Sequence, residues 1–446
     1  MSLPIAEQAR IALRRHVTDP LVARCIDHEF GGFLVDFDEQ WRPAGPHEKT
    51  LEHAARTTAA FGLMHRACPG EGYDALVRHG CAFLQGAFWD STHGGLFAKV
   101  DRGGHPCWEG LKHPHAVTYA AEAFLLAEPC LPPGDSRLWA NRCLAWMNDV
   151  AWDPIHGGYW GTYRRDNERY ADDARLPTLD GLDPVGVKLG FKEINTFGDA
   201  IEMLTEFAAR EDSKLHRARL AQLVDLLVHQ LSDSTGMLPF LYRRDWRPVP
   251  DLIRVGQQFQ TIHRLLAASE FSAGLGPSGR SSTAEIVERA REFADFCLAT
   301  ARHPSGGFCT AVSANGRVWP TAGPSSDQRQ WWIQLEAVRA FHALAIHESV
   351  DAASRARYES ARDQQWTYLS DYFFDNRHGG IWESPVDPAA RRNRRLKSLL
   401  GGKSEPMRKM HGWKDPLHEV GVFLALAQTE PGSRSTASPA QAIPAV

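Results

Sequence analysis

The chain has 446 residues, of which 43% are hydrophobic and 23% are charged, and its formal net charge at pH 7 is −4. This balance is typical of a soluble globular protein that is long enough to bury a large core. It excludes the strongly basic surface of a nucleic-acid-binding protein.

The N-terminal segment MSLPIAEQARIALRRHV has no apolar run followed by a cleavage site. No stretch approaches the roughly 20 apolar residues of a membrane span. The eight cysteines are scattered singly and form no C-x-x-C pair, which favours buried reduced thiols over disulfides or a zinc site. We therefore expect a cytoplasmic protein with no membrane association and no nucleic-acid partner.

A phrase of two glycines followed by an apolar, often aromatic, residue recurs along the chain, at Gly31, Gly94, Gly157, Gly306 and Gly379. The first two intervals are 63 residues each and the last is 73, whereas the gap of 149 residues before Gly306 spans about two units. A degenerate copy, STGMLPFLYRRDWRP near Gly236, fills that gap. Six units with a fixed period are typical of repeats that bury a continuous core only by stacking.

Each unit is predicted to contain the glycine phrase with a short strand or turn, followed by two helices. The glycines allow a positive φ where one helix ends and the next strand begins. In chain order the hydrophobic periodicity predicts helices over residues 5–27, 48–68, 73–89, 112–128, 136–150, 193–210, 213–231, 255–270, 283–301, 328–347, 352–373 and 414–428.

Twelve helices in six hairpins can form an open solenoid or a closed double ring. Segments such as HAVTYAAEAFLLA are apolar except near their start, whereas LVRHGCAFLQGAFW carries charges along one face. This alternation indicates inner and outer helices. We therefore predict an all-α fold, an (α/α)6 barrel with short strands in the Gly-Gly loops, whose first segment is the outer partner of the last inner helix. Residues 1–430 are expected to form one catalytic domain, and residues 431–446 a disordered tail.

Two long segments, residues 170–191 and 388–410, are rich in glycine, proline and charge. Loops of this length in a compact domain are usually functional lids or disordered. The second contains a basic run from Arg391 to Lys397, which is either a solvated loop or a contact for an anion.

In a closed ring the N-terminal ends of the inner helices open at the same end, so their polar side chains converge there. Helix N-termini also favour oxyanions, and tryptophans beside polar groups suit the apolar faces and hydroxyl edges of a sugar. The converging residues are expected to be Lys49, His53, Arg56, Lys112, His113, His115, Glu193, Asn195, Asp199, Glu202, Gln257, Gln260, His263, Gln330, Trp331, Trp332, Gln334, Glu336, Trp413, Lys414 and His418.

The repeats and four of these segments together resemble the N-acylglucosamine 2-epimerase superfamily, which includes cellobiose 2-epimerases, mannose isomerases and sulfoquinovose isomerases. The segments are an H-x-K…R stretch ending at Arg56, NTFGDAIE from Asn195, WWIQLEA from Trp331 and WKDPLHE from Trp413. The resemblance covers residues 5–428. It implies an enzyme without cofactor or metal, often a homodimer, that acts on the reducing end of a small-molecule carbohydrate.

The resemblance also implies that Arg56 holds the carbonyl side of the substrate and that His418 is one acid/base group. The family motif Gly-His-x-x-Glu-x-x-Trp of the fourth inner helix begins here at Gly256. Its histidine, glutamate and tryptophan positions are occupied by Gln257, Gln260 and His263. In the family motif Asn-x-x-x-His-x-x-Glu of the third inner helix, Asp199 replaces the histidine, and Asn195 and Glu202 are kept.

Glutamine cannot titrate, so the fourth helix does not supply the second base of a two-base epimerisation. An isomerisation through an enediol needs one base, His418, with Arg56 facing the developing oxyanion. Alternatively, Asp199 with Glu202 or His418 forms an acid/base pair for elimination or hydrolysis, or the chain is a non-catalytic sugar-binding descendant.

The catalytic candidates are therefore His418, Arg56, Asp199 and Glu202. The candidates for substrate binding are His115, Asn195, Gln257, Gln260, His263, Trp331, Trp332, Glu336, Trp413 and Lys414.

Overall fold

The computed structural model describes residues 3–211, 213–249, 253–272, 280–313, 328–386 and 408–428. Six helices surround a central axis: α3 (Leu51–Ala67), α5 (Pro114–Leu126), α7 (Ile194–Arg210), α9 (Val255–Ser272), α11 (Trp331–Ile346) and α14 (Leu417–Ala427). Six lie outside them: α1 (Ile5–Leu13), α4 (Tyr73–Phe83), α6 (Asp135–Trp146), α8 (Lys214–His229), α10 (Thr283–Thr300) and α12 (Ala352–Tyr372). A short helix, α2 (Asp19–Leu21), continues the direction of α1.

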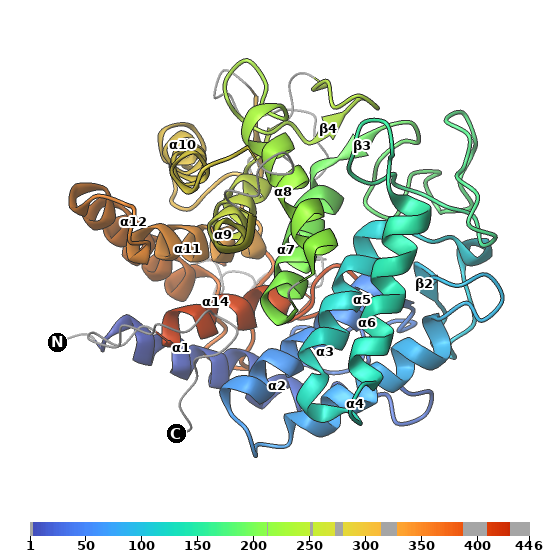
Figure 1. Cartoon of the computed structure of the whole chain (residues 1–446). Coiled ribbons are helices and arrows are strands. Elements are labelled where there is room, and N and C mark those ends of the chain that lie inside the picture. The colour runs from blue at the N-terminus through green and yellow to red at the C-terminus, as the bar shows by residue number, and fades with distance from the viewer. Residues whose placement is uncertain are drawn as a thin grey trace.

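The inner helices form a closed ring (Figure 1). Each contacts the next in the order α3, α5, α7, α9, α11 and α14, and α14 returns to contact α3. The outer helix α1 packs on α14, where Arg10 Nη2 donates a hydrogen bond of 2.9 Å to the carbonyl of Ala427. The first helix is thus the outer partner of the last inner one, and the predicted (α/α)6 barrel is confirmed.

Burial explains the two rings. Every residue of α5 is buried, whereas α12 buries one face, with Tyr358, Trp366 and Leu369 turned toward the inner ring. The main hydrophobic core therefore lies between the rings and within the inner one. Among the described residues, no helix has the length and apolarity needed to cross a membrane. Six of the eight cysteines are buried.

Several element boundaries differ from the prediction. The helix predicted over residues 5–27 passes through a π-helical turn at Arg14–Thr18 and ends at Leu21. The helix predicted from residue 414 begins at Leu417, because the side chain of Asp415 accepts a hydrogen bond from the Leu417 N–H at 2.9 Å. The loop predicted over residues 388–410 is described only from residue 408, and the tail over 431–446 lies outside the described residues.

The short strands form three antiparallel pairs, each joining two repeats. They are β1 (Lys49–Thr50) with β2 (Lys99–Val100), β3 (Lys192–Glu193) with β4 (Leu241–Tyr242), and β5 (Ile253–Arg254) with β6 (Ala311–Val312). The second strand of each pair follows a glycine phrase, as expected. The first strand leads directly into an inner helix, so each pair fixes the start of that helix against the next repeat.

Four buried lysines hold the glycine phrases, and two of them, Lys49 and Lys112, were expected in the cavity. The ammonium of Lys112 lies 3.2 Å from a carboxylate oxygen of Asp90, and both side chains are fully buried. The same arrangement recurs in three other repeats, in Lys49 with Asp27, Lys192 with Asp153, and Lys409 with Asp375. Placing Lys49 and Lys112 in the cavity was therefore wrong.

Two repeats use a glutamine instead. Gln258 exchanges hydrogen bonds with the backbone of Leu238, and Gln334 does the same with Phe308. Gln334 was therefore also wrongly expected in the cavity. An amide supplies both a donor and an acceptor, so it satisfies the backbone where no aspartate needs a cation.

We expect Lys112→Met to destabilise the fold by up to about 3–5 kcal/mol, because the buried Asp90 carboxylate loses its buried cation and keeps only the half-exposed guanidinium of Arg165. The free energy of unfolding in urea measures this loss. Lys214→Met, at an exposed lysine on an outer helix, is the control and should change stability by less than about 0.5 kcal/mol. Equal effects of the two substitutions would contradict a structural role for Lys112.

Candidate active site

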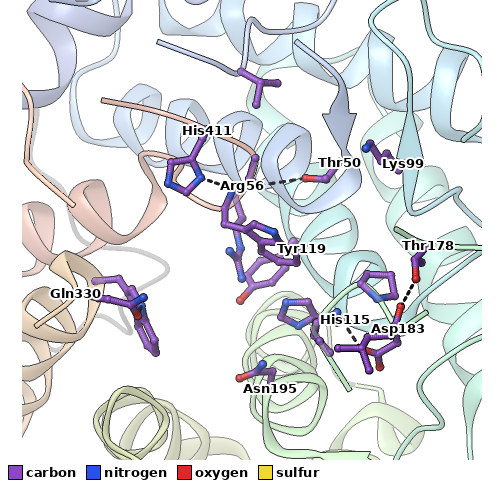
Figure 2. Close-up of a pocket in the computed structure, with 18 of the residues that line it drawn as sticks. Thr50, Arg56, Lys99, His115, Tyr119, Thr178, Asp183, Asn195, Gln330 and His411 are labelled. Carbon is purple, nitrogen blue, oxygen red and sulfur yellow. Dashed lines mark hydrogen bonds between the residues drawn. The ribbon is translucent and has the colours of Figure 1, made fainter. Parts of the chain in front are cut away.

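A cavity of about 760 Å³ opens at the N-terminal ends of the inner helices (Figure 2). This volume lies in the range of small-molecule sites. Ten of the predicted site residues line it: Arg56, His115, Asn195, Asp199, Gln257, Gln260, Trp331, Trp332, Trp413 and His418. Figure 2 shows Arg56, His115 and Tyr119 pointing into the cavity, with Gln330 reaching in from the other side. Ring closure thus brings residues from all six inner helices or the segments leading into them to one place.

Helix caps set the positions of several cavity residues. The Nδ1 of His113 accepts a hydrogen bond of 3.2 Å from the backbone N–H of His115 at the start of α5. The carboxylate of Glu193 caps α7 by accepting from the N–H groups of Asn195 and Thr196. Such caps satisfy N–H groups that have no partner within the helix. His113 and Glu193 were expected in the cavity itself, but they cap the helices that carry the lining residues.

His418 is partly buried and belongs to a chain of three side chains, of which the other two are buried. Its Nδ1 lies 2.7 Å from one carboxylate oxygen of Glu336, and the Nε2 of His263 lies 2.9 Å from the other. Burial alone would raise the pKa of Glu336, but hydrogen bonds from both histidines hold it well below its usual value. An ionised carboxylate accepts the Nδ1 proton of His418 and leaves Nε2 as the basic nitrogen.

Glu336 and His263 were predicted to bind substrate, but neither lines the 760 Å³ cavity. They lie behind His418 and fix the orientation of its ring. Trp332 lies on the cavity side, with its ring centroid 5.7 Å from that of His418. Trp332 and Glu336 on α11 therefore pack against His418 on α14, and His418 presents its basic nitrogen to the cavity.

A second histidine–carboxylate contact joins α5 to α7. The Nδ1 of His115 lies 2.6 Å from Oδ2 of Asp199, and both side chains are almost completely buried. The other oxygen of Asp199 accepts hydrogen bonds from the hydroxyl of Tyr119, at 2.8 Å, and from Arg264. Burial opposes ionisation, but Arg264 and His115 lower the pKa of Asp199. Asp199 is thus an ionised carboxylate whose Oδ1 accepts two hydrogen bonds, while Oδ2 contacts His115 without a hydrogen bond in the described structure.

Glu202 lies one helical turn beyond Asp199 and does not line the 760 Å³ cavity. Its carboxylate accepts a hydrogen bond of 2.8 Å from Nε of Arg264, and it borders a separate cavity of about 90 Å³. Although burial opposes ionisation, Arg264 and Arg339 lower the pKa of Glu202. The predicted pair of Asp199 and Glu202 is therefore held ionised by one guanidinium, and neither group is placed to act as a neutral acid.

Arg56 supplies a buried positive charge at the cavity wall. Its guanidinium carbon lies 4.0 Å from the centre of the Tyr119 ring, and Nη1 lies 3.4 Å from Asp415. Burial opposes the charge, but Tyr119 and Asp415 raise the pKa of Arg56 above its usual value. A fixed cation of this kind suits a developing oxyanion.

Gln257 and Gln260 of the fourth inner helix line the cavity. Nε2 of Gln257 donates a hydrogen bond of 2.8 Å to Oδ1 of Asn195, while Oε1 of Gln257 is buried without a partner in the described structure. A buried acceptor without a partner is costly. Gln257 is therefore suited to accept a hydrogen bond from a ligand hydroxyl.

The loop over residues 170–191 was expected to be either a functional lid or disordered. It borders the cavity, which favours a functional role. Residues from Thr178 to Gly186 line the opening, and Asp183 lies 3.3 Å from His113. The basic run Arg391–Lys397 lies outside the described residues.

Lys414 does not line this cavity, because its ammonium donates to the carbonyl of Lys409 at 2.8 Å.

Tyr119 and Arg264 are residues of the site that the sequence analysis did not single out. Arg264 carried a usable signal, since a charged residue within an apolar inner helix must find a buried partner. Tyr119 carried none, because a tyrosine in an apolar helix has an ordinary structural role. No group of three histidine, cysteine, aspartate or glutamate side chains in the described ranges is arranged to hold a metal ion.

Comparisons with known proteins agree with this geometry. The family model described as N-acylglucosamine 2-epimerase (GlcNAc 2-epimerase) matches residues 190–406. A cellobiose 2-epimerase of Bacteroides fragilis is 21% identical over 384 residues, which cover 83% of this chain and 88% of that protein. These two matches support the resemblance of the chain to the N-acylglucosamine 2-epimerase superfamily.

Solved structures share the fold. The cellobiose 2-epimerase of Bacillus thermoamylovorans superposes with a TM-score of 0.76 at 19% identity, covering 95% of this chain and 98% of that one. A D-mannose isomerase superposes with a TM-score of 0.76 at 16% identity, covering 96% of this chain and 99% of that one. These matches extend over both rings of the barrel.

Proposed function

We propose that the protein is an aldose–ketose isomerase or 2-epimerase that acts on a free reducing sugar or a derivative of one. The family and the relatives indicate an enzyme of the sugar epimerase and isomerase type. The observation that carries the proposal is the His418–Glu336 contact of 2.7 Å in a cavity that also contains the guanidinium of Arg56. A single barrel domain then holds all of the catalytic groups.

The chemistry follows from these three side chains. The open-chain sugar binds with its carbonyl oxygen at Arg56, and Nε2 of His418 removes the proton from the adjacent carbon. The electron pair of the broken C–H bond moves to the carbonyl oxygen, and Arg56 stabilises the resulting enediolate. Transfer of the O2 proton to O1 followed by return of a proton to C1 gives a ketose, whereas return of a proton to C2 as the C1 carbonyl re-forms gives an aldose. Glu336 stabilises the imidazolium that forms at His418.

The alternative of hydrolysis or elimination by Asp199 and Glu202 is less well supported. Such chemistry needs one neutral carboxylic acid beside one carboxylate, and Arg264 contacts both groups in the described structure. A protein that only binds a sugar does not require a buried carboxylate that orients a histidine. The contact of Glu336 with His418 therefore favours an enzyme over a non-catalytic sugar-binding descendant.

Proton exchange tests the proposal. The protein is incubated in D2O with free aldoses, including mannose and cellobiose, the sugars named in the relatives, and the C2 proton is followed by NMR. An enolising enzyme replaces that proton with deuterium. Tight sugar binding without exchange would support the binding descendant, and a new product without exchange would support the altered chemistry.

We also expect activity to survive chelation. The positive charge at the carbonyl oxygen comes from Arg56 and the base is His418, so the proposed reaction needs no metal ion. The initial rate of C2 exchange is compared before and after treatment with EDTA and gel filtration. Loss of the rate, followed by recovery on addition of a divalent cation, would refute this prediction.

A further inference from the structure

Two histidine–carboxylate contacts lie on opposite sides of the cavity. The order of contacts around the inner ring is α3, α5, α7, α9, α11 and α14. In a ring of six, α5 faces α11 and α7 faces α14. The pair His115 and Asp199 lies on α5 and α7, and the pair Glu336 and His418 lies on α11 and α14. The two pairs are therefore diametrically opposed.

The remaining two inner helices carry the groups for the substrate oxygens. Arg56 lies on α3, and Gln257 and Gln260 lie on α9, which faces α3 across the ring. A sugar carbon held between these two helices presents one face to α11 and α14 and the other to α5 and α7.

The environment of His115 matches that of His418. Its side chain is 4% exposed and lines the cavity, and Figure 2 shows it beside Tyr119 and above Asn195. Its Nδ1 lies against Asp199, which Arg264 and Tyr119 hold as an anion. The close contact engages Nδ1 electrostatically, without hydrogen-bond geometry in the described structure, and leaves Nε2 as the ring nitrogen for a ligand.

We propose that His115 is the second acid/base residue of this enzyme, so that the reaction is 2-epimerisation. This inference rests on the proposed function. It also accounts for the glutamine at position 257, because a histidine on α5 would supply the acid/base group that the family motif places at that position. Asp199 is then a positioning residue, whose carboxylate orients His115.

The reaction balances with these two groups. Nε2 of His418 removes the C2 proton from one face of an aldose, and the electron pair passes to the carbonyl oxygen at Arg56. The imidazolium of His115 then donates its Nε2 proton to the opposite face of C2 as the carbonyl re-forms. His418 ends protonated and His115 neutral, and both return to their starting states by exchange with water. The other epimer reacts with the roles reversed.

The test follows each epimer separately in D2O with the full-length protein. Wild type should interconvert an aldose and its 2-epimer and place solvent deuterium at C2 of the product. His115→Asn and His418→Asn should each lower interconversion by about 10² to 10⁴, the usual size of an acid/base contribution. Each should still exchange the C2 proton of one epimer, and the epimer should differ between the two variants. A merely structural residue would not produce this crossed pattern.

Asp199→Asn provides a test that does not remove the histidine. The amide keeps the shape but removes the negative charge beside His115, so exchange of the epimer that His115 deprotonates should fall. Exchange of the epimer that His418 deprotonates should stay close to the wild-type rate, which a general packing defect would not produce. Circular dichroism of each variant establishes that the barrel is folded.

Three outcomes would overturn the inference while leaving enolisation intact. They are wild-type exchange that yields a ketose and no 2-epimer, near-normal interconversion by His115→Asn, and loss of exchange from both epimers in folded His115→Asn. Absence of C2 exchange in wild type with every aldose would instead overturn the proposed function itself.

Discussion

Replacing His418 by alanine is expected to lower kcat by about 10² to 10⁴, because the substitution removes the group that takes the proton. Sugar binding should persist, since Arg56, Gln257 and Trp332 still line the cavity. Turnover is measured by the rate at which the sugar is converted to product, and binding by titration calorimetry. The result separates a catalytic role from a role in holding the sugar.

His411→Ala is the matched control for this experiment. His411 also lines the cavity, but its ring contacts Glu383, at 3.3 Å, rather than Glu336. We expect this variant to lose less than about tenfold in kcat, because it removes a wall residue and no proton acceptor. An equal loss in both variants would show that histidine truncation at the cavity acts through packing.

Removal of the last helix is expected to abolish the folded protein. A fragment that ends at Met410 lacks α14, which buries Val420, Val422, Phe423 and Leu426 against α1, α3 and α11. Burying four such side chains contributes roughly 6–12 kcal/mol, which is comparable to the whole stability of a typical domain, about 5–15 kcal/mol. We expect an insoluble or unfolded product in far-UV circular dichroism.

A fragment that ends at Gln428 is the control for this truncation. It retains α14 and removes only residues 429–446, so its helical signal and its cooperative melting should match those of the full chain. Closure couples the last hairpin to the first, whereas an open solenoid can melt piece by piece. A stable, helical fragment ending at Met410 would contradict that coupling.

The sequence by itself determined the architecture. The glycine phrases and the alternation of apolar and amphipathic segments predicted the helices and the ring. Helix periodicity and burial can be predicted because they depend on residues that are close together in the sequence. The replacement of a histidine by Gln257 was also readable, because it lies within a short motif. Boundaries were missed where local interactions compete, as at Arg14–Thr18 and at the Asp415 cap.

Only the tertiary structure decided which polar residues reach the cavity and which partners they have. Lys112 and Asp90, two residues with ordinary surface chemistry, are buried together, so Lys112 is structural. Glu336 contacts His418, 82 residues away, and His263, 73 residues away. The contact of His115 with Asp199 likewise joins two different helices. Such pairings depend on the rotation of each helix about its axis and on its neighbour in the closed ring, and neither is encoded in the local pattern of residues.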